Sequence, residues 1–139
     1  MKIATWNVER LKHKSALDEI RLICENLRAD ILVLTETDSR LHPSYPCTCH
    51  TPLLFEQQPD YYKPTENRVS IYTKYPCISS YATYDARTAL CIELETEKGN
   101  LLVYGTIIGI YGNRHTNFKD DLLEQVKDFK RMSTLAGIK

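Results

Sequence analysis

The spacing of apolar positions changes twice within the first quarter of the chain. Segment 2–8 has the apolar content of a first strand, and Ile31–Leu34 is a short, continuous apolar run typical of a strand buried on both faces. Between them, with Ser15 as the predicted N-cap, apolar residues at helical spacing predict a helix: Leu17, Ile20, Ile23, Cys24 and Leu27. A helix that links two strands predicts that they run parallel in one sheet.

The remaining chain passes from irregular to regular patterning. Segment 37–67 contains five prolines and predicts a long surface loop, with at most one short strand near Leu53–Phe55. Further strands are expected at Val69–Thr73, Thr88–Glu95 and Leu101–Ile110, with a hairpin turn at 97–100 between the last two. Asn117 is expected to cap a final helix, whose apolar positions are Phe118, Leu122, Val126 and Phe129.

This order of elements predicts an α/β (α+β) fold, with a mixed β-sheet and helices packed on one face. In Thr88–Glu95 the apolar residues alternate cleanly, which places Leu90, Ile92 and Leu94 on one face of the strand. The length of 139 residues suits one domain.

Composition narrows the classes of function. Lys plus Arg equals Asp plus Glu at 18 each, so whole-chain charge gives no sign of a nucleic-acid partner. No apolar run is long enough for a transmembrane helix, and the N-terminus lacks the apolar core of a signal peptide. The five cysteines are odd in number and show no framework spacing, which is typical of a reducing compartment. We therefore expect a cytoplasmic location.

Two polar residues follow the first two predicted strands. Asn7 ends the first strand and Glu36 ends the second. Ligands of open α/β sheets bind outside the carboxyl ends of parallel strands, so this amide and this carboxylate are expected to converge. Such hard oxygen ligands suit Mg²⁺ rather than zinc or copper. An alternative stays open, because an asparagine after a strand is commonly a turn residue and a glutamate there is commonly solvated.

Five segments in order add to this reading. Segment 2–8 reads Lys-Ile-Ala-Thr-Trp-Asn-Val, and segment 29–37 is an Asp-Ile strand that runs into Glu36. Segment 67–76 ends in Lys-Tyr-Pro, and segments 87–90 and 101–106 follow as strands. Over nearly the whole chain, this series resembles the endonuclease/exonuclease/phosphatase superfamily.

The resemblance implies a metal-dependent phosphodiesterase that uses Mg²⁺, with Mn²⁺ as a substitute, on a phosphate-ester substrate, nucleic acid included. Glu36 matches the family's metal-ligand glutamate, and Asn7 matches the asparagine beside the metal. Both are thus the predicted catalytic and metal-site residues. The implied architecture is half of a four-layer α/β/β/α sandwich, so that residues 1–139 form one partial domain, truncated before its C-terminal half.

The departures from the family pattern concern activity. The family usually places a His or Tyr at the end of the strand that matches Leu101–Ile108, and this strand has neither there. Tyr111 and His115 are nearby substitutes outside the motif position. The later Asp-x-Asn and Asp-His motifs are absent. Because removing one member of a catalytic unit costs orders of magnitude in rate, the isolated chain is predicted to have little or no hydrolytic activity.

Other readings compete with the enzyme fragment. A non-catalytic α/β module would use the same surface to bind a partner, or would form a homodimer through an exposed sheet face. A small nucleic-acid-binding domain would use Tyr61, Tyr62, Lys63 and Arg68, with Arg87, Arg114 and His115 as further cations, against the neutral charge. A zinc site at His42, Cys47, Cys49 and His50 lacks the usual ligand spacing, so incidental thiols are the simpler reading.

Overall fold

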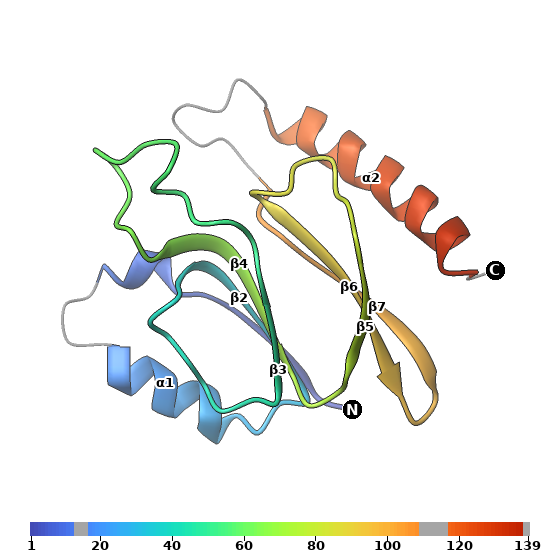
Figure 1. Cartoon of the computed structure of the whole chain (residues 1–139), viewed down its shortest axis with the longest axis horizontal. Coiled ribbons are helices and arrows are strands. Elements are labelled where there is room, and N and C mark those ends of the chain that lie inside the picture. The colour runs from blue at the N-terminus through green and yellow to red at the C-terminus, as the bar shows by residue number, and fades with distance from the viewer. Residues whose placement is uncertain (13–16, 109–116, 138–139) are drawn as a thin grey trace.

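The chain forms two β-sheets with one helix outside each (Figure 1). The computed structural model describes residues 1–12, 17–108 and 117–137. The first sheet has the strand order β1-β2-β4-β3. Its strands are β1 (Ile3–Asn7), β2 (Ile31–Asp38), β3 (Cys47–His50) and β4 (Glu66–Thr73). The predicted α/β (α+β) class is confirmed.

The pairing of β1 with β2 is parallel, as the helical connection predicts. Ile3 lies opposite Ile31, and the register continues until Asn7 lies opposite Thr35. Strand β4 runs antiparallel to β2 on its other side, and β3 forms the far edge. The carboxyl ends of β1 and β2 therefore lie at the same edge as the start of β4.

The irregular segment contains one misplaced prediction. Its short strand is β3, at Cys47–His50, whereas Leu53 makes only an isolated bridge to Asn67. Strand β3 alternates half-buried cysteines with exposed polar residues, and thiols give a weak apolar signal. Hydrogen bonding to β4 therefore defines this strand more than hydrophobicity does.

The second sheet has the strand order β5-β6-β7. Strands β6 (Ala89–Thr96) and β7 (Gly99–Thr106) form the predicted hairpin. Strand β5 (Cys77–Tyr81) was not expected from the sequence. It is an edge strand with a register irregularity between Cys77 and Ser79, so its side chains do not alternate regularly.

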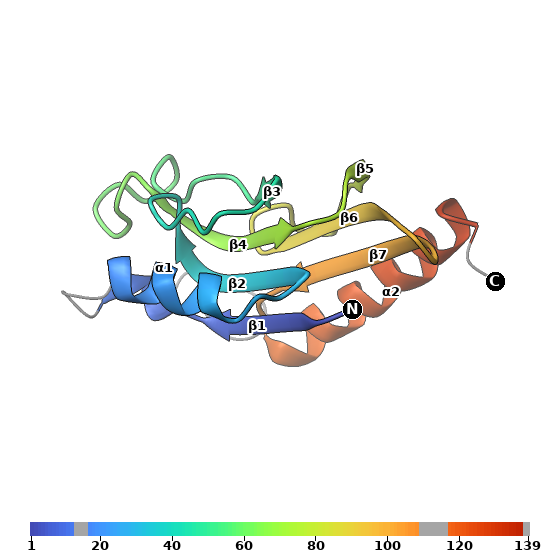
Figure 2. The ribbon, with the colours of Figure 1, turned by 90° about the horizontal axis from the view of Figure 1, so that it is seen from below.

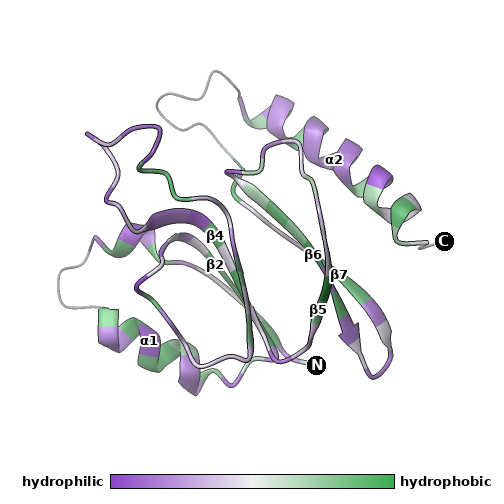
Figure 3. Ribbon diagram, in the orientation of Figure 1, coloured by the Kyte–Doolittle hydropathy of each residue, from purple (hydrophilic) through white to green (hydrophobic). Residues whose placement is uncertain are grey.

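The two sheets pack face to face, and their inner faces form one core. Ile31, Val69 and Ile71 of the first sheet are buried against Ile92 and Leu94 of the second. Strand β6 is hydrophobic along much of its length in Figure 3. The second sheet therefore covers much of the inner face of the first, whereas at the β1 edge Ile3, which shares a face with Ile31, is 60% exposed.

At Gly105 the sheets come so close that a side chain would not fit. A Cβ added there would lie 2.7 Å from Cγ1 of Val69 and 3.2 Å from Cγ1 of Val33. The missing side chain thus lets the end of β7 approach β2 and β4. This contact draws the second sheet toward the edge where Asn7 and Glu36 lie.

Helix α1 (Leu17–Asn26) covers the outer face of the first sheet. Its buried residues Ile20 and Cys24 pack in one cluster with Leu32, Leu34 and Tyr72. Leu17 and Leu27 are partly buried there too, whereas Ile23 is 48% exposed. The predicted cap, Ser15, lies outside the described residues. Four of the five residues in the predicted apolar stripe therefore contact the core.

Helix α2 (Phe118–Leu135) lies on the outer side of the second sheet (Figures 1 and 2). The Asn117 cap is confirmed, because its side chain accepts a hydrogen bond from the Asp120 N–H at 3.0 Å. Most of the apolar stripe is exposed, however, although the Phe129 ring meets that of Tyr104 on β7 edge to face at 4.8 Å. The residues that α2 buries are Asp121, Gln125, Asp128 and Met132. None of the described helices is long and apolar enough to cross a membrane.

Candidate active site

Asn7 and Glu36 lie at the same edge of the first sheet. The N–H of Val8 donates to the carbonyl oxygen of Thr35 at 3.0 Å, so the chain just after Asn7 is hydrogen-bonded to the residue before Glu36. The fold therefore brings the two predicted site residues to neighbouring positions. The parallel pairing of β1 with β2 produces this arrangement, as the sequence argument requires.

Glu36 adopts a backbone conformation that is unusual inside a strand. Its φ is +47°, in the left-handed region that non-glycine residues seldom occupy. The side chain is half-buried, and within the described ranges its carboxylate has no hydrogen bond or ion pair. Such a conformation costs on the order of 1–3 kcal/mol and persists only where the surrounding structure imposes it. Here the β2 ladder continues on both sides of Glu36.

The turn after β1 is also left-handed. Glu9, Arg10 and Leu11 all have positive φ, between +48° and +59°. The Asn7 side chain holds the start of this turn, because its Oδ1 accepts the Glu9 N–H at 2.9 Å. The amide nitrogen of Asn7 makes no hydrogen bond to any described residue. The geometry thus leaves Asn7 a donor to present at the sheet edge.

Two buried oxygen atoms beside Glu36 have no partner among the described residues. They are Oγ1 of Thr37 and Oδ1 of Asn67. These residues are a cross-strand pair, and both are almost completely buried. Buried polar atoms without a hydrogen bond are uncommon and call for a specific explanation. A polar ligand at this edge would provide one.

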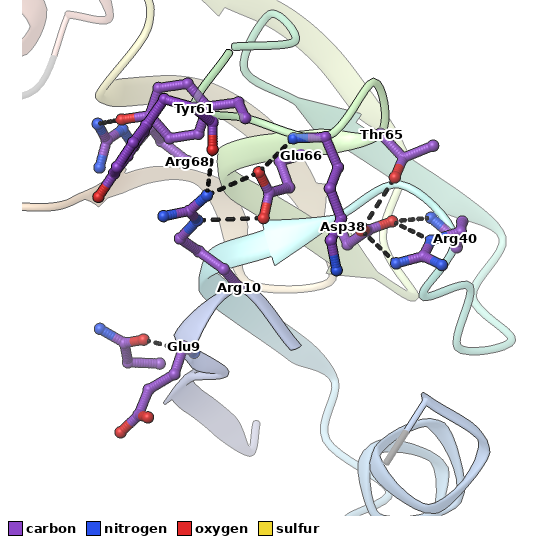
Figure 4. Close-up of polar contacts among 11 residues, drawn as sticks. Glu9, Arg10, Asp38, Arg40, Tyr61, Thr65, Glu66 and Arg68 are labelled. Atoms are coloured by element: carbon purple, nitrogen blue, oxygen red, sulfur yellow. Dashed lines mark hydrogen bonds and ion pairs between the residues drawn. The ribbon is translucent and has the colours of Figure 1, made fainter. Parts of the chain in front are cut away.

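A network of ion pairs fixes the surroundings of the site (Figure 4). Arg10 forms a two-pronged ion pair with the buried Glu66, with both N–O distances at 3.1 Å. Burial alone would lower the pKa of Arg10, but the hydrogen bond and charge of Glu66 outweigh it and raise that pKa. The pair joins the turn after β1 to the start of β4.

A second ion pair lies on the strand opposite. Asp38 is fully buried and accepts from Nε and Nη2 of Arg40 and from Oγ1 of Thr65. Burial would raise the pKa of the Asp38 carboxyl, yet the hydrogen bonds from Arg40 and Thr65 outweigh it and lower the pKa. Asp38 lies opposite Glu66 in the register of β2 and β4. The two ion pairs therefore stabilise the end of β2 and the start of β4.

Sequence reasoning missed Arg10, Asp38 and Glu66 as parts of the site surroundings. A charged residue at the end of a strand is usually solvated, and no local pattern distinguishes one that pairs over 56 positions of chain. The proline-rich loop that separates them was the only signal, because long loops on compact domains are often functional.

The cysteine and histidine cluster of the loop does not form a metal site. Cys47 and Cys49 point to one face of β3, whereas Nδ1 of His50 is 2.7 Å from Oγ of Ser70. The Cys49 thiol contacts those of Cys47 and Cys77, and burial followed by these neighbours raises its pKa to about 12. In the parts of the chain that the structure describes, no group of three or more His, Cys, Asp or Glu side chains could hold a metal ion.

Of the other residues considered as site candidates, the structure describes Arg87. Arg87 is exposed at the turn before β6, where its backbone N–H donates to Asp85. Tyr111, Arg114 and His115 lie outside the described residues. Substitution of the missing family histidine by Tyr111 or His115 therefore stays a prediction.

No protein-family model matches the sequence, and no curated protein matches it. Solved structures do match. A β-hairpin deletion mutant of beta toxin from Staphylococcus aureus has a TM-score of 0.61 over 99% of this chain, at 18% identity. The endonuclease domain of TRAS1, a telomere-specific non-LTR retrotransposon, has a TM-score of 0.62 over 94% of this chain, at 11% identity. A humanized D. rerio TDP2 has a TM-score of 0.58 over 96%, at 14% identity.

The chain spans only part of these neighbours, covering 62% of the beta toxin variant, 54% of the TRAS1 domain and 55% of TDP2. Another beta toxin variant, whose structure holds bound magnesium ions, is covered to 60% with a TM-score of 0.63. At these identities the likeness shows a shared fold. It does not by itself assign an activity.

Proposed function

We propose that this chain is the N-terminal part of a Mg²⁺-dependent phosphodiesterase domain of the endonuclease/exonuclease/phosphatase type, with Asn7 and Glu36 as its share of the metal site. The observation that carries this proposal is Glu36, a carboxylate in a left-handed conformation at the end of β2, without a described partner. Residues in strained backbone conformations cluster at active sites and ligand-binding positions. The shared fold with an endonuclease domain and with a magnesium-bound toxin structure supports it.

The donor atoms at this edge fit a hard divalent cation. Mg²⁺ commonly takes one or two carboxylates and fills its other positions with water and substrate phosphate. Glu36 offers a carboxylate, and the next residue pair along the β2–β4 ladder, Thr37 and Asn67, has two buried oxygens without a described partner. One carboxylate makes a weak site, so Mg²⁺, or Mn²⁺ in its place, would bind this chain only loosely.

Asn7 can bind the phosphate while it stands beside the metal. Its Oδ1 already accepts the Glu9 N–H, which fixes the amide so that its nitrogen is the available group. An N–H donor can bind a phosphate oxygen and hold the phosphorus in line for attack by water. The bound cation would supply charge stabilisation for that displacement.

Further groups are needed to complete this chemistry. Among the described residues, no second carboxylate lies beside Glu36 as a metal ligand, and no histidine has been placed with it. General acid–base catalysis typically contributes about 10²–10⁴ in rate, so its loss leaves little turnover. We infer that hydrolysis requires further polypeptide that supplies these groups.

The proposal is tested by following the ¹⁵N-labelled chain by NMR during titration with Mn²⁺, whose paramagnetism broadens nearby signals. We expect broadening centred on Asn7 and on residues 35–37, and its loss in Glu36→Gln. Glu95→Gln removes an exposed carboxylate from β6 and serves as the matched control. Broadening that is unchanged in Glu36→Gln contradicts the metal site.

Activity is measured separately, with a chromogenic phosphodiester in the presence of Mg²⁺. The isolated chain should hydrolyse it no faster than the Glu36→Gln variant. A Mg²⁺-dependent turnover that Glu36→Gln abolishes would show that the chain is catalytically complete, and would overturn the fragment proposal.

One observation favours a second candidate, a self-associating module. The apolar positions of α2 face solvent, with Leu122 40% and Phe129 46% exposed. Exposed apolar patches mark interaction sites. A homodimer through α2 would be an alternative to the predicted one through an exposed sheet face. Light scattering over a range of concentrations tests it, with Leu122→Lys as the variant that should remain a monomer.

A further inference from the structure

Two tyrosines and two arginines form an ordered group beside the candidate site, which we call the tyrosine platform: Arg10, Tyr61, Tyr62 and Arg68. The Arg10 guanidinium lies 4.6 Å from the ring centre of Tyr61 and 4.8 Å from that of Tyr62. The two rings meet edge to face at 4.7 Å. Arg68 lies 5.4 Å from the Tyr62 ring and donates to its hydroxyl at 2.6 Å.

The platform is held in place by hydrogen bonds and an ion pair to the buried Glu66. The buried Glu66 fixes the Arg10 guanidinium, and Nη2 of Arg10 also donates to the Tyr61 carbonyl at 2.9 Å. The Lys63 N–H donates to Glu66 at 2.7 Å, which ties the loop to the same carboxylate. The platform rings therefore need little further ordering when a ligand binds, and preorganised contacts lose less entropy.

Despite this support, the Tyr61 side of the platform faces solvent. Tyr61 is 62% exposed, although it contacts both Arg10 and Tyr62. A tyrosine ring that is held rigidly and left open presents a flat apolar surface with a polar tip. Such a surface suits a planar aromatic ligand.

The platform adjoins the site edge. Arg10 follows Asn7 by three residues, and Glu66 lies opposite Asp38, two residues beyond Glu36. Two residues of strand span no more than about 7 Å. A short chain of nucleotides can therefore reach from the platform to Glu36.

We propose that Tyr61 stacks on an unpaired base of a single-stranded nucleic acid whose backbone runs past Glu36; this rests on the proposed phosphodiesterase function and names its substrate class. Base–aromatic stacking tolerates any sequence, because every base has a π-face. It also supplies affinity without a strongly basic surface, which fits a chain of zero net charge.

The same contacts disfavour a cationic headgroup as the occupant. Guanidinium groups already lie over the Tyr61 and Tyr62 rings, so the attraction of these rings for a cation is partly used. A second cation would also meet the charges of Arg10 and Arg68. An uncharged base ring meets no such repulsion.

The test is the binding of a labelled oligothymidylate, followed by fluorescence anisotropy in EDTA, so that neither metal nor turnover contributes. An abasic strand of the same length carries the same backbone without bases. The chain should bind oligothymidylate more tightly than the abasic strand. Tyr61→Ala should weaken oligothymidylate binding about tenfold and leave abasic binding unchanged, whereas Tyr61→Phe should bind like the unchanged chain.

Phe55→Ala is the matched control, because it removes a partly exposed ring from the same loop outside the platform. Equal losses on both strands in Tyr61→Ala, or no preference of the unchanged chain for bases, overturn the stacking proposal. Because Mn²⁺ binding at Glu36 is measured without nucleic acid, that failure would leave the phosphodiesterase proposal standing with another phosphate ester. Failure of metal binding with base-dependent stacking intact would leave a nucleic-acid-binding module.

Discussion

The two helices of this chain dock on their sheets by opposite means. Helix α1 buries an apolar residue and a thiol, Ile20 and Cys24, against the first sheet. Helix α2 holds the second sheet through polar groups: Oδ2 of Asp128 accepts from the Tyr104 hydroxyl at 2.7 Å and from the Tyr84 N–H at 2.8 Å. The hydrophobic effect thus drives the first docking, whereas the second combines hydrogen bonds with fewer apolar contacts, those of Met132 and of Phe129 with Tyr104.

The difference indicates which side of the molecule exposes more apolar surface. An amphipathic helix normally turns its apolar stripe to the core, and α2 turns its stripe outward. Apolar surface left in water contributes nothing to folding, so α2 is stabilised less than α1 by the chain as it stands.

The largest difference in stability is expected when one apolar side chain is truncated beneath α1 and another on α2. Leu34→Ala removes a fully buried side chain beneath α1, and should lower the free energy of unfolding by about 2–5 kcal/mol. Leu122→Ala on α2 should change it by no more than about 0.5 kcal/mol, because that side chain is already in water. Urea unfolding of both variants measures the contrast, and equal losses would mean that the α2 stripe is buried in solution.

The sequence allowed the α1 layer to be predicted almost completely and the α2 layer only in part. Helical spacing locates both helices, and Asn117 marks the start of α2. Periodicity reports which residues share a face, but it does not report which face meets the sheet. That choice depends on Tyr104 and Thr106 of β7, whose hydroxyl groups bond to Asp128 and Gln125 and attract the polar side of the helix.

Removing the buried carboxylate of α2 should lower the free energy of unfolding by less than Leu34→Ala does. Its effect should be confined to α2 and the second sheet. Asp128→Asn weakens the bonds to Tyr84, Tyr104 and Arg131, and should cost about 1–3 kcal/mol. Hydrogen exchange should show faster opening of α2 and no change in α1. Glu124→Gln, which removes a charge from the same helix, is the control. An Asp128→Asn variant with unchanged free energy of unfolding would contradict the docking of α2 through polar groups.

The contact between the layers can be tested at Gly105. Gly105→Ala places a methyl group 2.7 Å from Cγ1 of Val69, and this overpacking should cost about 1–3 kcal/mol. Adding Val69→Ala should relieve the clash, so the double variant should lose less than the sum of the two single changes. Strict additivity in this cycle would show that the sheets separate to accommodate the methyl group.

The candidate site was predictable to the level of strand ends. The β-α-β pattern places Asn7 and Glu36 at one edge, because parallel neighbours end together. The left-handed conformation of Glu36 and the Arg10–Glu66 ion pair were beyond reach, because both depend on tertiary contacts across a loop without regular patterning. The tyrosines of that loop were visible as candidates, but their support by Arg10 was not.

The smallest effect is expected from pH, and it should be similar in both layers. Burial raises the pKa of Cys24, on the buried side of α1, from 9.0 to about 11, and burial followed by the charge of Asp128 does the same for Cys91, on β6 beneath α2. Above pH 9 the unfolded thiols ionise while the folded ones stay neutral, so stability present below pH 9 is lost as the pH rises toward 11. Each thiol should account for about 1 kcal/mol between pH 8 and pH 10.

Urea unfolding at pH 8 and pH 10 measures this loss, and Cys24→Ala and Cys91→Ala should each reduce it by a similar amount. Asp128→Asn should reduce the share of Cys91 and leave that of Cys24 intact, because only Cys91 feels the Asp128 charge. A loss that depends on Cys24 alone would mean that α2 leaves its sheet before the thiol beneath it ionises. That result would identify the α2 layer as the first part of the fold to open.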